Sequence, residues 1–129
     1  METGAKSAIY PEQELTQKIL EASFAVHNSL GAGFLEKVYA NALLLELRQM
    51  GLVCMQEVAF KVKYKDVIVG DYSADLVIDK RVLIGLKACT GLESVHEAQL
   101  LNYLKASGIR VGLLMNFGKP RLEYRRFVL

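Results

Sequence analysis

Residues 82–115 read VLIGLKACTGLESVHEAQLLNYLKASGIRVGLLM and contain two short apolar runs separated by a helix-forming segment. The runs VLIGL and VGLLM carry no charge, which is typical of strands buried on both faces of a sheet. Ser94 and Glu97 have capping-box spacing, which predicts a helix from there to about Ser107, ended by Gly108. The order strand, helix, strand predicts a βαβ unit with a right-handed crossover.

Two amphipathic helices are expected before this unit. Pro11 occupies a tolerated first helical position, and Gly31 is expected to end that helix. Its apolar residues at helical spacing are Leu15, Ile19, Ala22, Val26 and Leu30. The second helix is expected over residues 35–50, before Gly51. Its expected buried stripe is Leu35, Val38, Ala42 and Leu45.

The apolar period changes to two after residue 52, which predicts a meander of antiparallel strands. The expected strands are residues 53–58, 60–64, 67–69, 72–78 and 82–86. Asp79 and Lys80 are expected to form the turn before the last of them, because the flanking residues are apolar and mostly β-branched. A terminal strand is expected at residues 122–128. The element order predicts an α/β fold of the α+β kind, with a mixed central sheet flanked by helices.

Composition limits the class of protein. With 129 residues, 52% hydrophobic and 23% charged, the chain is expected to form one domain over residues 1–129, with residues 1–10 flexible. The net charge of +2 means that any nucleic-acid surface must be local. No apolar run approaches the roughly 20 residues of a membrane span, and the start has no apolar signal core, so we expect a cytoplasmic protein. Cys54 and Cys89 lack zinc-site spacing and are expected to be free, buried thiols.

Polar residues embedded in apolar strands are the candidates for chemistry. Asp75 precedes an apolar run, and Lys87 ends the neighbouring strand. Burying an unpaired charge is costly, so these two residues either pair with each other or serve a ligand. Gln99 and Tyr103 are four residues apart, on one face of the following helix. Polar groups from two strands and a helix are therefore expected to converge at one end of the sheet.

Several motifs in this order resemble a known family. The segment GFLEKVY at residues 33–39 matches the signature of the GxxExxY proteins, a group of the PD-(D/E)xK nuclease-like superfamily. The resemblance covers nearly the whole chain, including Val26, His27 and Leu30 of the first helix, the Asp75 and Lys87 strands, and HEAQLLNYL at residues 96–104. It implies a restriction-endonuclease-like core.

The resemblance also implies roles for single residues. In nucleases of this superfamily a helix glutamate, a strand aspartate, an E-x-K pair and a helix Q-x-x-x-Y help to hold a divalent metal against the scissile phosphate. For this chain it implies that Glu36 and Asp75 bind Mg²⁺ or Mn²⁺, with Asp75, Lys87, Gln99 and Tyr103 as the catalytic set. The implied reaction is hydrolysis of phosphodiester bonds in DNA or RNA.

One position departs from that pattern, because Gly85 stands where the glutamate of E-x-K is expected. Mg²⁺ prefers carboxylate oxygens, so activity is expected to be weakened or lost. Glycine in a strand also costs stability, so either another group approaches at this position or function has been lost. Another acid could substitute, and the candidates are Glu57, Asp71 and Glu93. The alternatives are an inactive module that binds nucleic acid or a protein, and a structural subunit of a larger, possibly homo-oligomeric, assembly.

The strand register tests this site. Side chains alternate across a strand, so Gly85 and Lys87 share a face, and Asp75 joins them only if it lies opposite residue 85 or 87. A two-residue turn at Asp79 and Lys80 would place Asp75 opposite Ile84. The site therefore requires a three-residue loop or a bulge at residues 79–81.

The other polar residues have simpler interpretations. Glu36 could equally be a first-turn carboxylate that favours the helix N-terminus. Tyr39 is expected to pack with a hydrogen-bonded hydroxyl, and His27 to lie on a helix flank without a ligand role. His96 is expected to cap its helix or lie at the surface, and the alternative is that it faces the Lys87 region. Lys61, Lys63 and Lys65 indicate the solvated face of an edge strand and, alternatively, a path for a phosphate backbone. Arg121, Arg125 and Arg126 are a second candidate basic patch.

Overall fold

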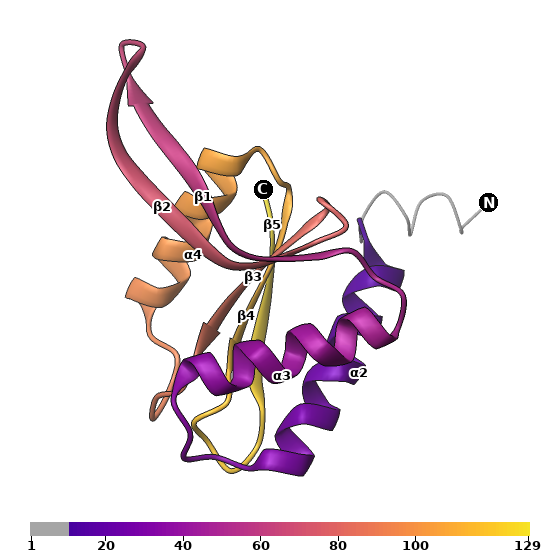
Figure 1. Cartoon of the computed structure of the whole chain (residues 1–129). Coiled ribbons are helices and arrows are strands. Elements are labelled where there is room, and N and C mark those ends of the chain that lie inside the picture. The colour runs from indigo at the N-terminus through magenta and orange to yellow at the C-terminus, as the bar shows by residue number, and fades with distance from the viewer. Residues whose placement is uncertain (1–10) are drawn as a thin grey trace, which may run out of the picture.

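The computed structural model describes residues 11–129, so the expectation about residues 1–10 concerns a segment outside them. Within the described residues the helices are α2 (Gln13–Leu30), α3 (Glu36–Gln49) and α4 (Ser94–Ser107). The strands are β1 (Cys54–Tyr64), β2 (Val67–Ile78), β3 (Val82–Lys87), β4 (Val111–Asn116) and β5 (Glu123–Val128). They form one sheet in the order β1-β2-β3-β4-β5, in which only β3 and β4 are parallel. The expected mixed sheet with its βαβ unit is confirmed (Figure 1).

The sheet is covered by helices on both faces. One apolar cluster joins α2 and α3 to one face of the sheet, and a smaller cluster joins α4 to the other face. All six residues of β4 are buried, as expected for a strand covered on both sides. None of the helices in residues 11–129 is long and apolar enough to span a membrane.

The helix boundaries agree with the sequence, but the buried face of α3 does not. In α2, which begins two residues after Pro11, the expected apolar stripe faces the core. In α3 the prediction was wrong, because Leu35, Val38 and Leu45 are exposed. The buried residues of α3 are instead Tyr39, Ala40, Leu43 and Leu47. Both stripes are apolar at helical spacing, and packing against α2 and the sheet selects the one that contains Tyr39.

The cap of α4 lies one residue earlier than expected. Glu93 is the N-cap, and its backbone N–H donates to Nδ1 of His96 at 3.0 Å. The capping pair is therefore Glu93 and His96 in place of Ser94 and Glu97, because an imidazole at this position reaches back as a glutamate would. Gly108 ends the helix with a φ of 76°, as expected.

The β1–β2 hairpin is longer than the separate strands expected, and it changes its packing partner half-way. Leu76 packs with the α2 and α3 cluster, whereas Ala74 packs with the α4 cluster. Between them, Glu57 and Asp75 lie opposite each other without pairing, and Glu57 has a φ of 54°. This left-handed residue interrupts the ladder, as a β-bulge does. The outer part, residues 58–74, which we call the arm, extends beyond the rest of the sheet (Figure 1).

Three smaller expectations can be compared with the structure. Lys61 and Lys63 lie exposed on β1, which is an edge strand as expected, and Lys65 lies in the turn that follows it. Cys54 and Cys89 are free thiols, the first buried and the second half-buried. His27, expected on a helix flank, is buried, and its Nε2 is 2.8 Å from the carbonyl oxygen of Lys119.

Candidate active site

The GxxExxY segment forms a turn that is held by its own tyrosine. Gly33 has a φ of 116°, which favours glycine. The buried Tyr39 hydroxyl donates to the carbonyl of Gly31 at 2.5 Å and accepts the backbone N–H of Phe34 at 3.1 Å. The Tyr39 ring also stacks on Phe117, with 4.8 Å between centroids. The expected packing role of Tyr39 is confirmed. Through these contacts the Tyr39 side chain fixes the start of α3.

Glu36 is the first residue of α3, and Asp75 lies near it on β2. The pairs Ile78–Val82, Val77–Leu83 and Leu76–Ile84 leave three residues in the β2–β3 turn. One more step of this register places Asp75 opposite Gly85, so the expected three-residue loop is confirmed. Oδ2 of Asp75 accepts the backbone N–H of Leu86 at 2.7 Å. This bond fixes the carboxylate at the end of β3.

Lys87 and α4 supply the remaining groups. The Lys87 ammonium donates to Oε1 of Gln99 at 3.2 Å. Tyr103 lies one helical turn further on and meets Tyr72 of β2 edge-on, with 5.0 Å between ring centroids. Lys87 does not pair with Asp75 within salt-bridge distance among the described residues. Asp75 and Lys87 were expected either to pair with each other or to serve a ligand, and the second interpretation is therefore favoured.

The predicted residues surround one small cavity of about 60 Å³. Its lining includes Glu36, Asp75, Gly85, Lys87, Gln99 and Tyr103. Glu36 and Asp75 also line a larger cavity of about 490 Å³, together with Glu57, Phe34 and Leu35. The two cavities share these two carboxylates, so both acidic groups face both cavities.

A family model described as the PD-(D/E)XK nuclease superfamily matches residues 13–127. The chain belongs to this superfamily. No curated protein and no solved structure matches the chain significantly. Membership in the PD-(D/E)XK nuclease superfamily agrees with the mixed sheet flanked by helices, so the fold is of the nuclease-like α/β kind.

Two titratable groups of the candidate site have a shifted pKa. Burial is the main cause that raises the pKa of Asp75, and the charges of Glu36 and Glu57 raise it further. The hydrogen bond from the Leu86 N–H and the charge of Lys87 act in the opposite direction. Burial likewise raises the pKa of Tyr103, helped by the charge of Asp75 and by Tyr72. A carboxyl group held near other carboxylates is stabilised when a cation neutralises them.

The position of Gly85 has room for a Cβ atom. A Cβ atom there would lie 3.4 Å from Leu114 and 3.5 Å from Leu100, both ordinary contacts with side chains. Gly85 does not have the positive φ that favours glycine. Of the groups that could approach this glycine, another backbone is wrong, whereas a ligand stays a prediction.

The donor set fits a weakly held divalent ion. Mg²⁺ is commonly bound by one or two carboxylates plus water and substrate phosphate, and Glu36 and Asp75 supply two carboxylates at one cavity. In residues 11–129 no three His, Cys, Asp or Glu side chains come together closely enough to hold a metal ion. A cation here would therefore depend on substrate oxygens to complete its coordination.

The structure separates the three candidate substitute acids. Glu57 lines the larger cavity beside Asp75, and its carboxylate pairs with Lys37 at 3.0 Å. Asp71 lies on the arm and pairs with Lys61, and Glu93 caps α4. Of the three acids named from the sequence, Glu57 is therefore the one that lies at the candidate site.

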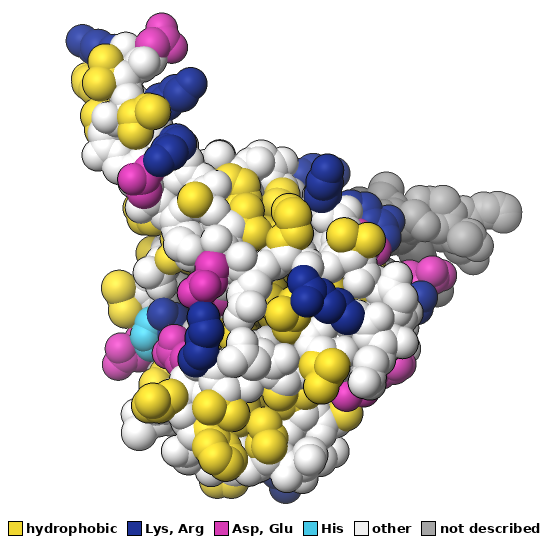
Figure 2. All heavy atoms as spheres, in the orientation of Figure 1, with side chains coloured by type: hydrophobic (Ala, Val, Ile, Leu, Met, Phe, Trp, Pro, Cys, Tyr) yellow, Lys and Arg dark blue, Asp and Glu magenta, His cyan; other side chains and the backbone are white. Residues whose placement is uncertain are grey.

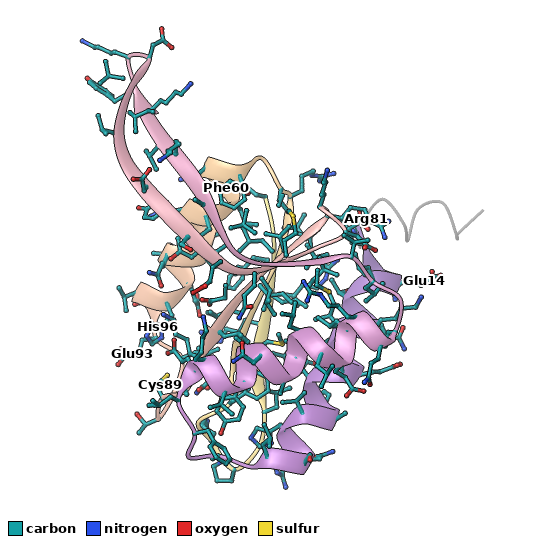
Figure 3. All side chains as sticks on the ribbon, viewed as in Figure 1. Glu14, Phe60, Arg81, Cys89, Glu93 and His96 are labelled. Carbon is teal, nitrogen blue, oxygen red and sulfur yellow. The ribbon has the colours of Figure 1, made fainter. Side chains whose placement is uncertain are left out.

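Two other groups of residues can be compared with expectation. His96 caps α4 and also lines the small cavity with Lys87, as its place in the first turn of the helix allowed. Figure 3 shows His96 beside Glu93 at the start of α4. The arginine patch is not formed, because Arg125 pairs with Glu97 whereas Arg126 bonds to the carbonyl of Pro11. Neighbouring residues on β5 point to opposite faces of the sheet.

Proposed function

We propose that this protein acts on nucleic acid through a PD-(D/E)XK site whose metal-dependent phosphodiester hydrolysis is weakened or lost at Gly85. The observation that supports this is the convergence of Glu36, Asp75, Lys87 and Gln99 on one cavity that Gly85 also lines. The spacing and order of the GxxExxY segment further support membership in the GxxExxY group.

The proposed roles follow from the positions of the side chains. Asp75 and Glu36 would hold Mg²⁺ or Mn²⁺, which when bound supplies an activated water and charge stabilisation at the phosphate. Lys87 carries the positive charge that faces the phosphate or the attacking water. Gln99 orients the Lys87 ammonium through their 3.2 Å hydrogen bond, and Tyr103 orients the substrate from the next turn of α4.

Gly85 is the point at which the proposal can be tested. The space beside it accepts a Cβ atom without a backbone clash, so Gly85→Glu should fold. The new carboxylate would enter the wall of the small cavity. We expect Gly85→Glu to raise Mg²⁺- or Mn²⁺-dependent cleavage of DNA or RNA by about 100-fold or more over the parent.

The experiment compares cleavage of single- and double-stranded DNA and RNA by four proteins. Gly85→Glu should cleave, the double variant Gly85→Glu with Lys87→Ala should not, and the parent should be slow or silent. Gly91→Glu is the matched control, because Gly91 lies in the β3–α4 loop with open space around it. If the parent cleaves measurably, Glu57→Gln should reduce that activity, because Glu57 is the remaining acid at the cavity. Silence from Gly85→Glu would contradict the nuclease proposal.

A second candidate is an inactive module of the same fold that binds nucleic acid or a protein. It is favoured by Gly85 and by the lack of a three-ligand metal group in the described residues. It predicts salt-dependent binding of oligonucleotides without cleavage by any of the four proteins. Binding of neither DNA nor RNA would leave the protein-binding form of this candidate.

A further inference from the structure

A second hollow lies beside the candidate site, between the arm and α4. This groove has a volume of about 620 Å³ and is lined by Lys61, Val62, Lys63, Tyr72, Asn102 and Lys105. The arm rises past α4 in Figure 1, and Figure 2 shows basic and apolar side chains together on it. The groove therefore has one wall from an edge strand and one wall from a helix.

The lining of this groove is cationic. Three lysines and no carboxylate line it. Lys61 pairs with Asp71 at 2.8 Å, but both side chains are more than half exposed, so solvent screens the pair. Lys63 and Lys105 have no carboxylate partner within salt-bridge distance in residues 11–129. Lysines gathered in a concave surface attract an anion, and they reach it as flexible point charges.

The groove lies next to the small cavity of the candidate site, and the rings of Tyr72 and Tyr103 lie between the two. Tyr72 lines the groove and Tyr103 lines the cavity, and their rings are in contact at 5.0 Å. Along β2, Asp71, which pairs with Lys61 across the hairpin, is four residues from Asp75. At about 3.3 Å per residue this separation is about 13 Å, a few nucleotides of an extended strand.

We propose that the groove between the arm and α4 binds the phosphodiester backbone of the nucleic-acid strand whose neighbouring phosphate faces Asp75 and Lys87. This inference rests on the proposed function and adds the path of the substrate. Lys63 and Lys105 contact phosphates from opposite walls, and Asn102 donates to phosphate or sugar oxygens. Such contacts read the backbone and not the base sequence. DNA and RNA share this chemistry, so both are tested.

The test measures the binding of fluorescein-labelled single-stranded DNA and RNA 20-mers by fluorescence anisotropy, with EDTA present, over a range of NaCl concentrations. In Lys63→Glu with Lys105→Glu we expect at least tenfold weaker binding. The slope of log K against log salt should become shallower by about 1.4, from about 0.7 for each lost phosphate contact on a single strand. Lys63→Arg with Lys105→Arg should bind as the parent does, because the charges remain.

The matched control is Lys18→Glu with Arg121→Glu, which changes the net charge equally. Lys18 is exposed on α2, and Arg121 is exposed in the loop before β5, both outside the groove. Equal urea midpoints would show that both double variants fold. If the control weakens binding as much as the groove variant, or if the parent binds neither oligonucleotide, the proposal is overturned. Weaker binding of only DNA or only RNA identifies which strand uses the groove.

Failure of this inference can be told apart from failure of the proposed function. If hydrolysis is wrong, Gly85→Glu stays silent while the groove variant still loses binding. If the groove is wrong, Gly85→Glu cleaves equally well with or without Lys63→Glu and Lys105→Glu.

Discussion

Lys87 and Asn116 are neighbours in the sheet, and their hydrogen-bond environments are opposite. They are the last residues of the two parallel strands and face each other in register. Asn116 is fully buried, and its amide bonds to the backbone N–H and carbonyl of Cys89, to the N–H of Gly118 and to Glu123. Lys87 is half-buried and has one side-chain partner, Gln99.

The comparison indicates how to separate structural polar groups from those available to a ligand. Around Asn116 each polar group satisfies another, so the cluster fastens the start of the β3–α4 loop to the β4–β5 loop. Burial raises the pKa of Asp75, and the carboxylates of Glu36 and Glu57 add to this rise against the Leu86 N–H and Lys87, which costs stability unless a ligand compensates. Of the two adjacent strand ends, that of β4 holds two loops together through Asn116, which we call the lock, and that of β3 lies at the candidate site.

The largest effect on stability is expected from adding one methyl group at Gly118, between the β3–α4 loop and the β4–β5 loop. A Cβ atom on Gly118 would lie 2.4–2.7 Å from backbone atoms of Cys89 and Ala88, so the two loops must separate. We expect Gly118→Ala to lower the free energy of unfolding by about 3 kcal/mol, measured by urea denaturation. Gly91→Ala, with open space around the new methyl group, should change it little. Equal effects would contradict this account of the lock.

The next largest effect is a difference in stability between variants at the two strand ends, Asn116 and Lys87. Asn116→Ala leaves the N–H groups of Cys89 and Gly118 without their partner and should lower the free energy of unfolding by about 2–3 kcal/mol. Lys87→Ala removes one half-buried hydrogen bond and should cost about 1 kcal/mol or less. Urea denaturation of the two variants gives the comparison. A larger loss in Lys87→Ala would mean that Lys87 is structural.

The smallest effects are expected in the pH dependence of stability, and they have opposite signs. The hydrogen bond from Asn116 lowers the pKa of Glu123, against its burial, with help from the Leu92 N–H and from Lys119. The stability that Glu123 contributes is present above the pKa of the unfolded state and is lost as pH falls through the lower pKa of the folded state. Glu123→Gln should therefore lower stability at neutral pH and reduce the loss in acid.

Asp75 behaves in the opposite way because its folded pKa is raised. The folded state holds this proton more tightly, so stability gained from Asp75 appears as pH falls below the folded pKa. Asp75→Asn should raise the free energy of unfolding at neutral pH and remove that gain. Denaturation between about pH 3 and 8 with EDTA present measures both variants. A destabilised Asp75→Asn at neutral pH would show that the carboxylate serves the fold.

Part of the site could be predicted from the sequence because its geometry is local. The spacing of Gln99 and Tyr103 fixes them on one helix face, and alternation fixes Gly85 and Lys87 on one strand face. The three-residue turn followed from requiring Asp75 on that same face, and the structure confirms it. Each of these inferences needs only a helical or strand period.

The remaining placements could not be predicted from the sequence, because packing between distant segments decides them. The sequence named Glu57 as one of three candidate acids, and the hairpin register places it opposite Asp75. Leu35 looked like a core residue, yet it lines the larger cavity. The groove needs Lys63 from β1 and Lys105 from α4, which no local period brings together.

The sequence by itself determined the order of helices and strands, the buried parallel strands and the family resemblance, because periodicity and short motifs are properties of neighbouring residues. Only the tertiary structure decided which face of α3 is buried, where the hairpin changes its packing partner, and that Asn116 forms four hydrogen bonds while Asp75 lies near Glu36 and Glu57 with one backbone hydrogen bond. These properties depend on contacts between segments far apart in the chain. Burial and compensation of charge are set by those contacts and not by residue type.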